Sequence, residues 1–332
     1  MRFIAAIAKL VLSLGLLALI VSRIDASSLP TLLLESKTSW AIVITTMALL
    51  LQGILAGWRQ IDIVMLLGSR LTMFGSLRVW FVGLFINQVG LTFIASDVMR
   101  ALQLMQEGVP RLAAGRAVVL DRIIGLGVLL LMIDAVLPII AKLTENAALK
   151  YGLFILVGLS TSGLLCLLAA GFVTPLLTKL PDRVLQHRLF EICLDLISVS
   201  RFFYTQPARS LRIATLSFVM HLLNVAALVW IARALNADAS PWAMAVVIIP
   251  VMFLSMLPIS IAGWGVREAA AATALSLLQV PTQIALTASV GFGLSSIIAS
   301  LPGILVLLTP RPSQKLPTVN ALASIRSPEH LK

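Results

Sequence analysis

The sequence predicts an all-α polytopic membrane protein, with about six full transmembrane helices and two oppositely oriented re-entrant helical hairpins. Three observations support this fold class. Of the 332 residues, 59% are hydrophobic and only 12% are charged, about half the charged fraction of soluble domains. The mean hydropathy is +1.03. Apolar runs of roughly 18 or more residues recur along the chain, and each is long enough to cross the hydrocarbon core of a bilayer.

Six apolar segments are predicted to cross the membrane fully. They comprise residues 3–22, 39–57, 117–140, 151–174, 211–233 and 283–309. The first has a basic start like a signal peptide, but its long apolar part lacks a convincing small-residue cleavage site, so we expect an uncleaved span. Residues 1–310 therefore form a single transmembrane domain. The polar, proline-rich residues 311–332 are expected to be a disordered cytoplasmic tail.

Two further apolar regions are interrupted, and we predict that each forms a re-entrant hairpin. Residues 77–108 begin as a span but are broken by Asn87, Gly90 and Ser96, after which the sequence becomes polar. Residues 242–280 also begin as a span, break at IAGWG and resume as a short apolar helix. Non-helical backbone at membrane depth is tolerated only where protein or a water-filled cavity surrounds it.

The distribution of lysine and arginine predicts the orientation. With six full crossings and two hairpins, 19 of the 25 lysines and arginines face the inside, and six (residues 23, 37, 142, 150, 233 and 267) face the outside. Cytoplasmic loops carry such an excess. We therefore expect a multi-pass protein of the cell inner membrane with both termini cytoplasmic. The same distribution accounts for the net charge of +11 without nucleic acid as a partner.

In this topology the two hairpins open to opposite sides of the membrane, and their sequences weakly echo one another. Arg100 is followed ten residues later by Pro110, and Arg267 fourteen residues later by Pro281. The two spacings differ by about one helical turn. Inverted repeats with broken helices are typical of many secondary transporters, whose substrate site lies at the repeat interface.

Motifs for nucleotide hydrolysis and for common hydrolytic chemistry are absent from the sequence, which contains no GxxxxGK[ST], GxSxG or HExxH. The two cysteines form no CxxC motif, and the three histidines are widely scattered, so no metal-ligand cluster can be recognised. We therefore expect neither an enzymatic activity nor a cofactor or metal site.

Ionisable side chains at membrane depth are the remaining candidates for function, because a charge at a helix centre costs roughly 2.5–3.5 kcal/mol on insertion scales. Three acid–base pairs stand out: Asp97 with Arg100, Asp121 with Arg122, and Arg267 with Glu268. The planar fork of arginine can hold a phosphate through two parallel hydrogen bonds. The carboxylates would balance the arginines or receive the amine of a zwitterionic headgroup.

The predicted substrate site also includes Asn87, at the break in the first hairpin, and the glycines Gly263 and Gly265. Glycine lets the backbone approach a ligand closely. Neighbouring Asp121 and Arg122 would point about 100° apart on a helix and need different partners. The alternative interpretation is structural: Asp97 with Arg100, and Arg267 with Glu268, would be ion pairs that fix the hairpin tips.

Three stretches resemble the lysylphosphatidylglycerol synthase transmembrane (flippase-like) family. They are FINQVGLTFIASDVMRALQLMQEGVP, AAGRAVVLDRIIGLGVLLL and LPISIAGWGVREAAAATALSLLQVP, and the resemblance covers residues 1–310 or nearly so. It implies a membrane domain with two re-entrant hairpins that moves an amphipathic lipid between leaflets. The family usually has Gly-Gly-Asp where this chain has Ala95-Ser96-Asp97, and Ala262 replaces the first of two expected glycines. No stretch of these 332 residues resembles the aminoacyl-transferase domain of some relatives, so we do not expect that activity from them.

We therefore expect flippase-like translocation of a phospholipid or glycolipid, with an anionic or zwitterionic headgroup, between the leaflets of the inner membrane. Two alternatives stay open. One is a non-transporting membrane subunit that assists a lipid- or glycan-modifying enzyme, which would then be its partner. The other is a secondary transporter of small solutes. The oligomeric state does not follow from the sequence.

Overall fold

The computed structural model describes residues 29–89, 93–148, 205–257, 260 and 262–309, together with 150–165 apart from gaps. All regular secondary structure within these ranges is α-helical, which confirms the all-α class. The predicted span 3–22 and the predicted tail 311–332 lie outside the described residues.

Four predicted spans are confirmed as helices long and apolar enough to cross a membrane. They are α3 (Ser36–Leu66), α6 (Arg111–Leu143), α11 (Pro207–Ala234) and the continuous pair α14 (Thr282–Ser300) and α15 (Pro302–Leu308). A short helix, α2 (Leu29–Leu34), precedes α3. Of the predicted span 151–174, the residues described up to 165 are helical. The protein is therefore an integral, multi-pass membrane protein.

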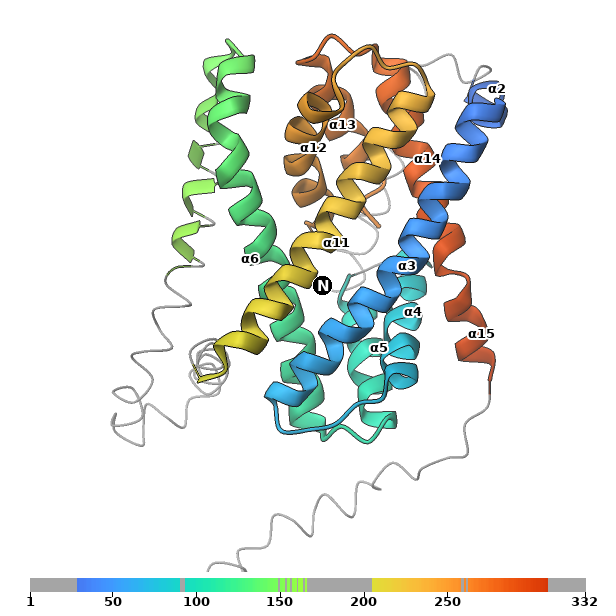
Figure 1. Cartoon of the computed structure of the whole chain (residues 1–332), viewed down its shortest axis with the longest axis vertical. Helices are drawn as coiled ribbons and strands as arrows, with labels where there is room; N and C mark the ends of the chain where they lie inside the picture. Colours follow the sequence, from blue (N-terminus) through green and yellow to red (C-terminus); the bar gives the residue numbers. More distant parts are fainter. Residues whose placement is uncertain are drawn as a thin grey trace, which may run out of the picture.

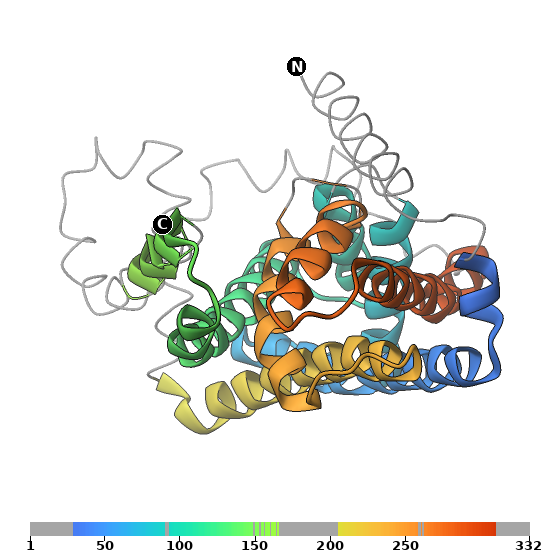
Figure 2. The same cartoon turned by 90° about the horizontal axis from the view of Figure 1, so that it is seen from above.

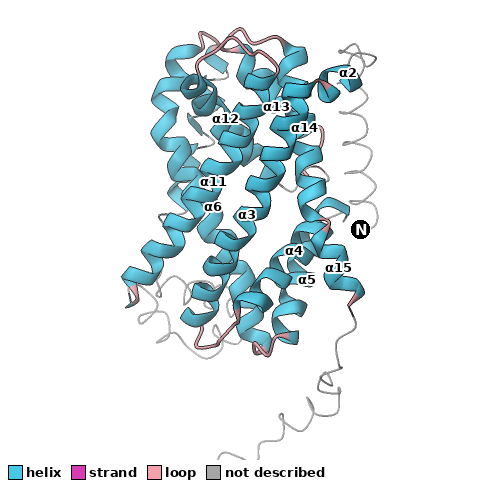
Figure 3. Ribbon diagram, turned by 45° about the vertical axis from the view of Figure 1, so that its right-hand side comes forward, coloured by secondary structure: helices cyan, strands magenta, loops and turns pink. Residues whose placement is uncertain are grey.

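The two interrupted regions each form a pair of helices. The first contains α4 (Met73–Val89) and α5 (Phe93–Gln106), and the second contains α12 (Pro241–Met256) and α13 (Val266–Ser276). Within each pair the two helices pack against one another. The pairs lie at opposite ends of the helix bundle, with α12 and α13 at the top and α4 and α5 at the bottom (Figures 1 and 3). That each pair enters and leaves the membrane on one side stays a prediction.

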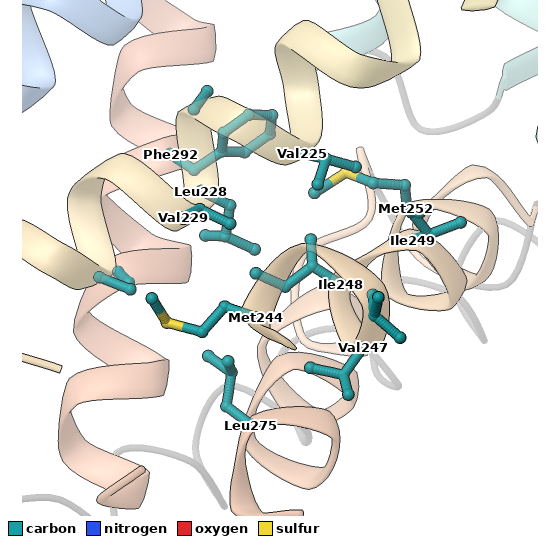
Figure 4. Close-up of a cluster of buried hydrophobic side chains, with 14 of the residues drawn as sticks. Val225, Leu228, Val229, Met244, Val247, Ile248, Ile249, Met252, Leu275 and Phe292 are labelled. Carbon is teal, nitrogen blue, oxygen red and sulfur yellow. The ribbon is translucent and has the colours of Figure 1, made fainter. Parts of the chain in front are cut away.

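The long helices join two separate apolar cores. The larger core gathers buried side chains from α3, α6, α11, α12 and α14 at the end of the bundle that holds the second helix pair. Figure 4 shows part of it, where Leu228 of α11, Met244 and Ile248 of α12, and Leu275 of α13 come together. The smaller core joins α4, α5 and the first turns of α6 to the end of α3.

The outward faces of the long helices are apolar. Trp40, Met47, Leu211, Trp230 and Leu305 are all more than half exposed. Soluble monomers rarely present such continuous apolar surface, whereas a lipid-facing surface requires it. Helix α11 runs beside α3 along its length (Figure 2), and between the two apolar cores these helices turn polar side chains inward. The fold thus places a polar layer in the interior of a lipid-facing bundle.

Candidate functional site: an arginine-lined cavity between the helix pairs

A cavity with a volume of about 260 Å³ lies between the two helix pairs. The first pair contributes Trp80 and Asn87 from α4 and Arg100 from α5, and the second contributes Ser255 from α12 and Arg267 from α13. Further polar side chains come from the long helices α3, α6 and α11 and include Arg59, Asp121, Arg122, His221 and Asn224. The space between the two helix pairs is therefore a cavity with a mixed apolar and polar lining, whose charged side chains are mostly basic.

The first charged cluster places one carboxylate between two arginines. Asp121 Oδ1 lies 2.6 Å from Arg59 Nη2, and Asp121 Oδ2 lies 2.8 Å from Arg100 Nη2. All three side chains are buried, with exposed fractions of 4–6%. The cluster carries two positive charges and one negative charge. One positive charge is therefore left without a counter-charge from these three residues.

Neighbouring helices fix the two arginines of this cluster in place. Arg59 Nη1 donates a hydrogen bond to Ser217 Oγ of α11 over 3.1 Å. Arg100 Nη2 donates to Gln60 Oε1 of α3 over 2.7 Å. Gly83 of α4 makes room for Arg100, because a Cβ atom at that position would lie 2.6 Å from Arg100 Cγ. The arginines are thus preorganised by contacts from three helices.

His221 is a further polar group in the cavity wall. Its Nε2 donates to the carbonyl oxygen of Gly125 over 2.9 Å, and its side chain is buried. The bond joins the middle of α11 to α6 and assigns the proton to Nε2. This histidine therefore links two of the long helices that line the cavity.

The second charged cluster joins α5 to α6. Arg122 donates from Nε and Nη2 to Asp97 Oδ1 over 3.0 and 2.8 Å, and Nε also lies 3.2 Å from Oδ2. Both side chains are about 30% exposed. The expected pairing of Asp97 with Arg100 is therefore wrong, because Arg100 faces α6 and reaches Asp121 instead. The expectation that Asp121 and Arg122 need different partners is confirmed.

The third cluster lies at the start of α13. Glu268 Oε1 accepts hydrogen bonds from Arg267 Nε and Nη2, over 3.1 and 2.7 Å, and from Ser289 Oγ over 3.0 Å. Its other oxygen, Oε2, accepts from the backbone N–H of Gly265 over 2.5 Å. This last bond is half of a capping box, which satisfies a free N–H at the helix start. The predicted pair Arg267–Glu268 is confirmed, and Glu268 is fully buried.

Aromatic rings and glycines shape the surroundings of Arg267. Its guanidinium lies 4.9 Å from the centre of the Trp264 ring and 5.3 Å from that of Phe292, both within cation–π range. A Cβ atom on Gly293 would lie 2.5 Å from both Arg267 Nη2 and Trp264. Glycine at 293 therefore leaves the space in which the arginine and the indole ring sit.

The turn that leads into α13 requires glycine for its backbone. Gly263 and Gly265 adopt φ angles of +81° and +85°, a region that side chains disfavour. These two predicted site residues thus shape the turn, and neither lines the cavity. Ala262 has a φ of +49°, at the position where the family resemblance implied a glycine.

The structure brings five of the nine predicted site residues to one cavity: Asn87, Arg100, Asp121, Arg122 and Arg267. Asp97 and Glu268 are held to their arginines and do not line it. Arg59 is a cavity residue that the sequence does not single out, because the predicted span ends at residue 57 and places Arg59 in the following loop. Helix α3 continues to Leu66, and the apolar residues after Trp58 were the signal that could have revealed this.

The lining of the cavity offers hydrogen-bond donors above all. Within the described ranges, no three His, Cys, Asp or Glu side chains are grouped so that they could hold a metal ion. Its chemistry comes instead from guanidinium groups, which bind oxyanions such as phosphates and carboxylates. Amide and hydroxyl groups on the same walls add uncharged hydrogen-bonding capacity.

Comparisons with curated proteins and with solved structures gave no significant match. A comparison with protein families gave a match that extends over residues 6–303. The match spans the described helices from α2 to α14 and hence every wall of the cavity. On this evidence, the chain belongs to the family described as "Lysylphosphatidylglycerol synthase TM region".

Proposed function

We propose that this protein moves an amphipathic lipid, a phospholipid or glycolipid, between the leaflets of the cell inner membrane without converting it chemically. Both termini would be cytoplasmic, as the distribution of basic residues predicts. The observation that carries the proposal is the arginine-lined cavity between two helix pairs at opposite ends of a lipid-facing bundle. A headgroup would cross through this cavity while the acyl chains stay in the bilayer.

The energetic cost of the cavity's charges supports a functional role. Three arginines of the cavity, Arg59, Arg100 and Arg267, are at most 6% exposed. Removing charges from water costs several kcal/mol for each ion, and a well-packed apolar replacement is often equally stable or more so. A purely structural bundle would therefore gain little from such groups, whereas a site that must replace the water around a charged headgroup needs them.

The size of the cavity supports a headgroup rather than a whole lipid as its content. Its volume is about 260 Å³, just below the roughly 300–1,000 Å³ of pockets that enclose drug-sized ligands. A phosphorylated headgroup fits this space, and two acyl chains do not. The apolar outer faces of α3, α11 and α15 would leave the chains in contact with the surrounding bilayer.

Family membership supports a lipid as the substrate, because the family description names the membrane region of a phospholipid synthase. The same membership agrees with the alternative in which the chain assists a lipid-modifying enzyme. The position of the arginines favours translocation over that alternative. They face an internal cavity, where an enzyme docked on the outside of the bundle would not meet them.

Leaflet exchange in liposomes tests the proposal. The full-length protein would be reconstituted with phospholipids that carry a fluorophore on the headgroup, and a membrane-impermeant quencher would report the fraction of label that reaches the outer leaflet. We expect exchange well above that of protein-free liposomes, and a decrease of about tenfold or more in R100Q. This variant leaves Asp121 paired with Arg59. R111Q, at an exposed position, should match the wild type.

Exchange no faster than in protein-free liposomes would overturn the proposal. Co-purification of a transferase with an inactive protein would then favour the enzyme-assisting alternative. Uptake of a water-soluble anion without lipid exchange would favour the small-solute transporter.

A further inference from the structure

We propose that the end of the cavity formed by Arg59 and Arg100 is a binding site for one phosphate group of an anionic headgroup that has no amine. The inference rests on the proposed function for the lipid source of the phosphate. This site narrows the substrate class to headgroups without an amine, because the amine of a zwitterionic or cationic headgroup would find no unpaired carboxylate among the described residues at this end of the cavity.

Unused hydrogen-bond donors point to a missing acceptor. Arg59 Nε and Arg100 Nε are buried, and within the described part of the chain neither has a hydrogen-bond acceptor. The same holds for the indole Nε1 of Trp80. All three side chains line the cavity. Leaving a buried donor unpaired costs about 1–3 kcal/mol, and more for a charged group, so these donors favour an oxyanion that accepts several hydrogen bonds at once.

The geometry holds the two arginines close enough to share one ligand. Both form ion pairs with the same carboxylate, one with each oxygen of Asp121, at 2.6 and 2.8 Å. Trp80 lies one helical turn before Gly83, whose backbone packs against the side chain of Arg100. A phosphate between the arginines would thus reach donors from α3 and α5, with α4 as the neighbouring wall.

Among the described residues, the charges that line the cavity are paired one to one except at this end. Arg122 is paired with Asp97, and Arg267 is paired with Glu268. Arg59 and Arg100 share the single carboxylate of Asp121. The excess is one positive charge, which matches the single negative charge of a phosphodiester.

The same pairing argues against an amine in the headgroup. Among the described residues, Asp121 is the acidic side chain that lines the cavity, and Asp97 and Glu268 lie behind its arginines; each of the three carboxylates is bound to an arginine. An incoming ammonium group would have to displace a guanidinium from its partner. The cavity walls instead offer the side-chain amides of Gln52, Asn87 and Asn224, which hydrogen-bond to hydroxyl groups. A glycerol or sugar attached to the phosphate fits this lining.

Thermal unfolding of the detergent-solubilised full-length protein, followed by tryptophan fluorescence, tests the site. The probes are short-chain phosphatidylglycerol, short-chain phosphatidylcholine, inorganic phosphate and a phosphate-free diacylglycerol of equal chain length. We expect saturable stabilisation by phosphatidylglycerol, with a half-saturating concentration at least tenfold below that for phosphatidylcholine or inorganic phosphate. The diacylglycerol should give no saturable effect.

The variants R59Q, R59K and R100K separate ligand binding from folding. R59Q leaves Asp121 paired with Arg100, and the lysine variants keep the charge but lose the Nε donor and the planar fork. Each should raise the half-saturating concentration of phosphatidylglycerol at least tenfold, whereas R111Q should not change it. Equal binding of phosphatidylcholine, or wild-type binding by R59Q and R59K, would overturn the inference. Inorganic phosphate binding as tightly as phosphatidylglycerol would assign the site to a free anion and overturn the headgroup assignment.

This result can be told apart from the outcome of the exchange assay. Binding that depends on Arg59, with no leaflet exchange, would refute translocation and leave the phosphate site intact. Exchange that is indifferent to headgroup charge and to R59Q would refute the phosphate site and leave translocation intact.

Discussion

Removing the charge of Glu268 is the sharpest test of how the start of α13 is held together. The variant E268Q keeps the shape of the side chain. Glu268 is 0% exposed and accepts four hydrogen bonds, three of them at Oε1 and one at Oε2. A glutamine amide has only one acceptor oxygen, so its NH₂ group would face either the Arg267 side or the N–H of Gly265, both of which are donors.

The expected loss of stability follows from these contacts. If the amide oxygen faces Arg267, the bond to Gly265 N–H is lost, which costs about 0.5–2 kcal/mol as for other helix caps. Most of the destabilisation comes from Arg267, which is 5% exposed and would keep its charge without a counter-charge. Breaking a buried ion pair in this way costs about 3–5 kcal/mol. We expect E268Q to lower the free energy of unfolding by about that amount.

Equilibrium unfolding in mixed detergent micelles measures this loss, and the double variant R267Q/E268Q provides the control. The double variant removes both charges and should be less destabilised than E268Q alone, because no unpaired buried charge remains. A loss below about 1 kcal/mol in E268Q would refute the reasoning. The reasoning would also be refuted if the loss of stability in R267Q/E268Q equalled the sum of the losses in R267Q and E268Q, because additive losses indicate that the two residues act independently.

Three further substitutions test the structure away from this pair, each by the same unfolding measurement. D97N should cost no more than about 1 kcal/mol, because the Asp97–Arg122 pair is partly exposed; a loss as large as that of E268Q would show that this pair is effectively buried. A262G should stabilise the protein by about 0.5–1 kcal/mol. It relieves the strain of the φ of +49° at Ala262, which costs about 1–2 kcal/mol, while the greater conformational entropy of glycine in the unfolded chain offsets part of this gain. A destabilised variant would contradict the turn geometry. G303A should cost about 1–3 kcal/mol, because its Cβ would collide with the carbonyl oxygen of Phe81, and wild-type stability would show that α15 does not pack closely on α4.

The fold class and four of the spans could be predicted because they depend on length and hydropathy, which are local properties of the sequence. The breaks in the two helix pairs were visible for the same reason, since IAGWG and the residues after Val89 interrupt apolar runs. The expectation that Asn87 and Ser96 also break the first pair is wrong, because both lie inside helices, Asn87 in α4 and Ser96 in α5. The pair Arg267–Glu268 was also within reach, because the two residues are adjacent and meet inside one helix start.

Pairing between helices could not be predicted from spacing. Asp97 and Arg100 are three residues apart on α5 and looked like a pair, yet each bonds to a residue of α6. Which face of α5 meets α6 depends on the packing of α5 against α4 and of α6 against α3. Arg59 was missed because charge counting assigns an arginine near a span end to the adjacent loop. The structure buries it at the cavity because α3 continues through Leu66.

The central claim is that a lipid headgroup crosses through the cavity, and blocking the cavity tests it most directly. In a background with Cys166 and Cys193 replaced by serine, Asn224, which lines the cavity, would be changed to cysteine. Leu222, exposed on the same helix, would supply the control position. Leaflet exchange is then measured before and after complete reaction with a bulky thiol reagent, with the extent of labelling checked by mass spectrometry. The account predicts that labelled N224C falls to the rate of protein-free liposomes while labelled L222C keeps its rate. Unchanged exchange in fully labelled N224C would contradict passage through the cavity.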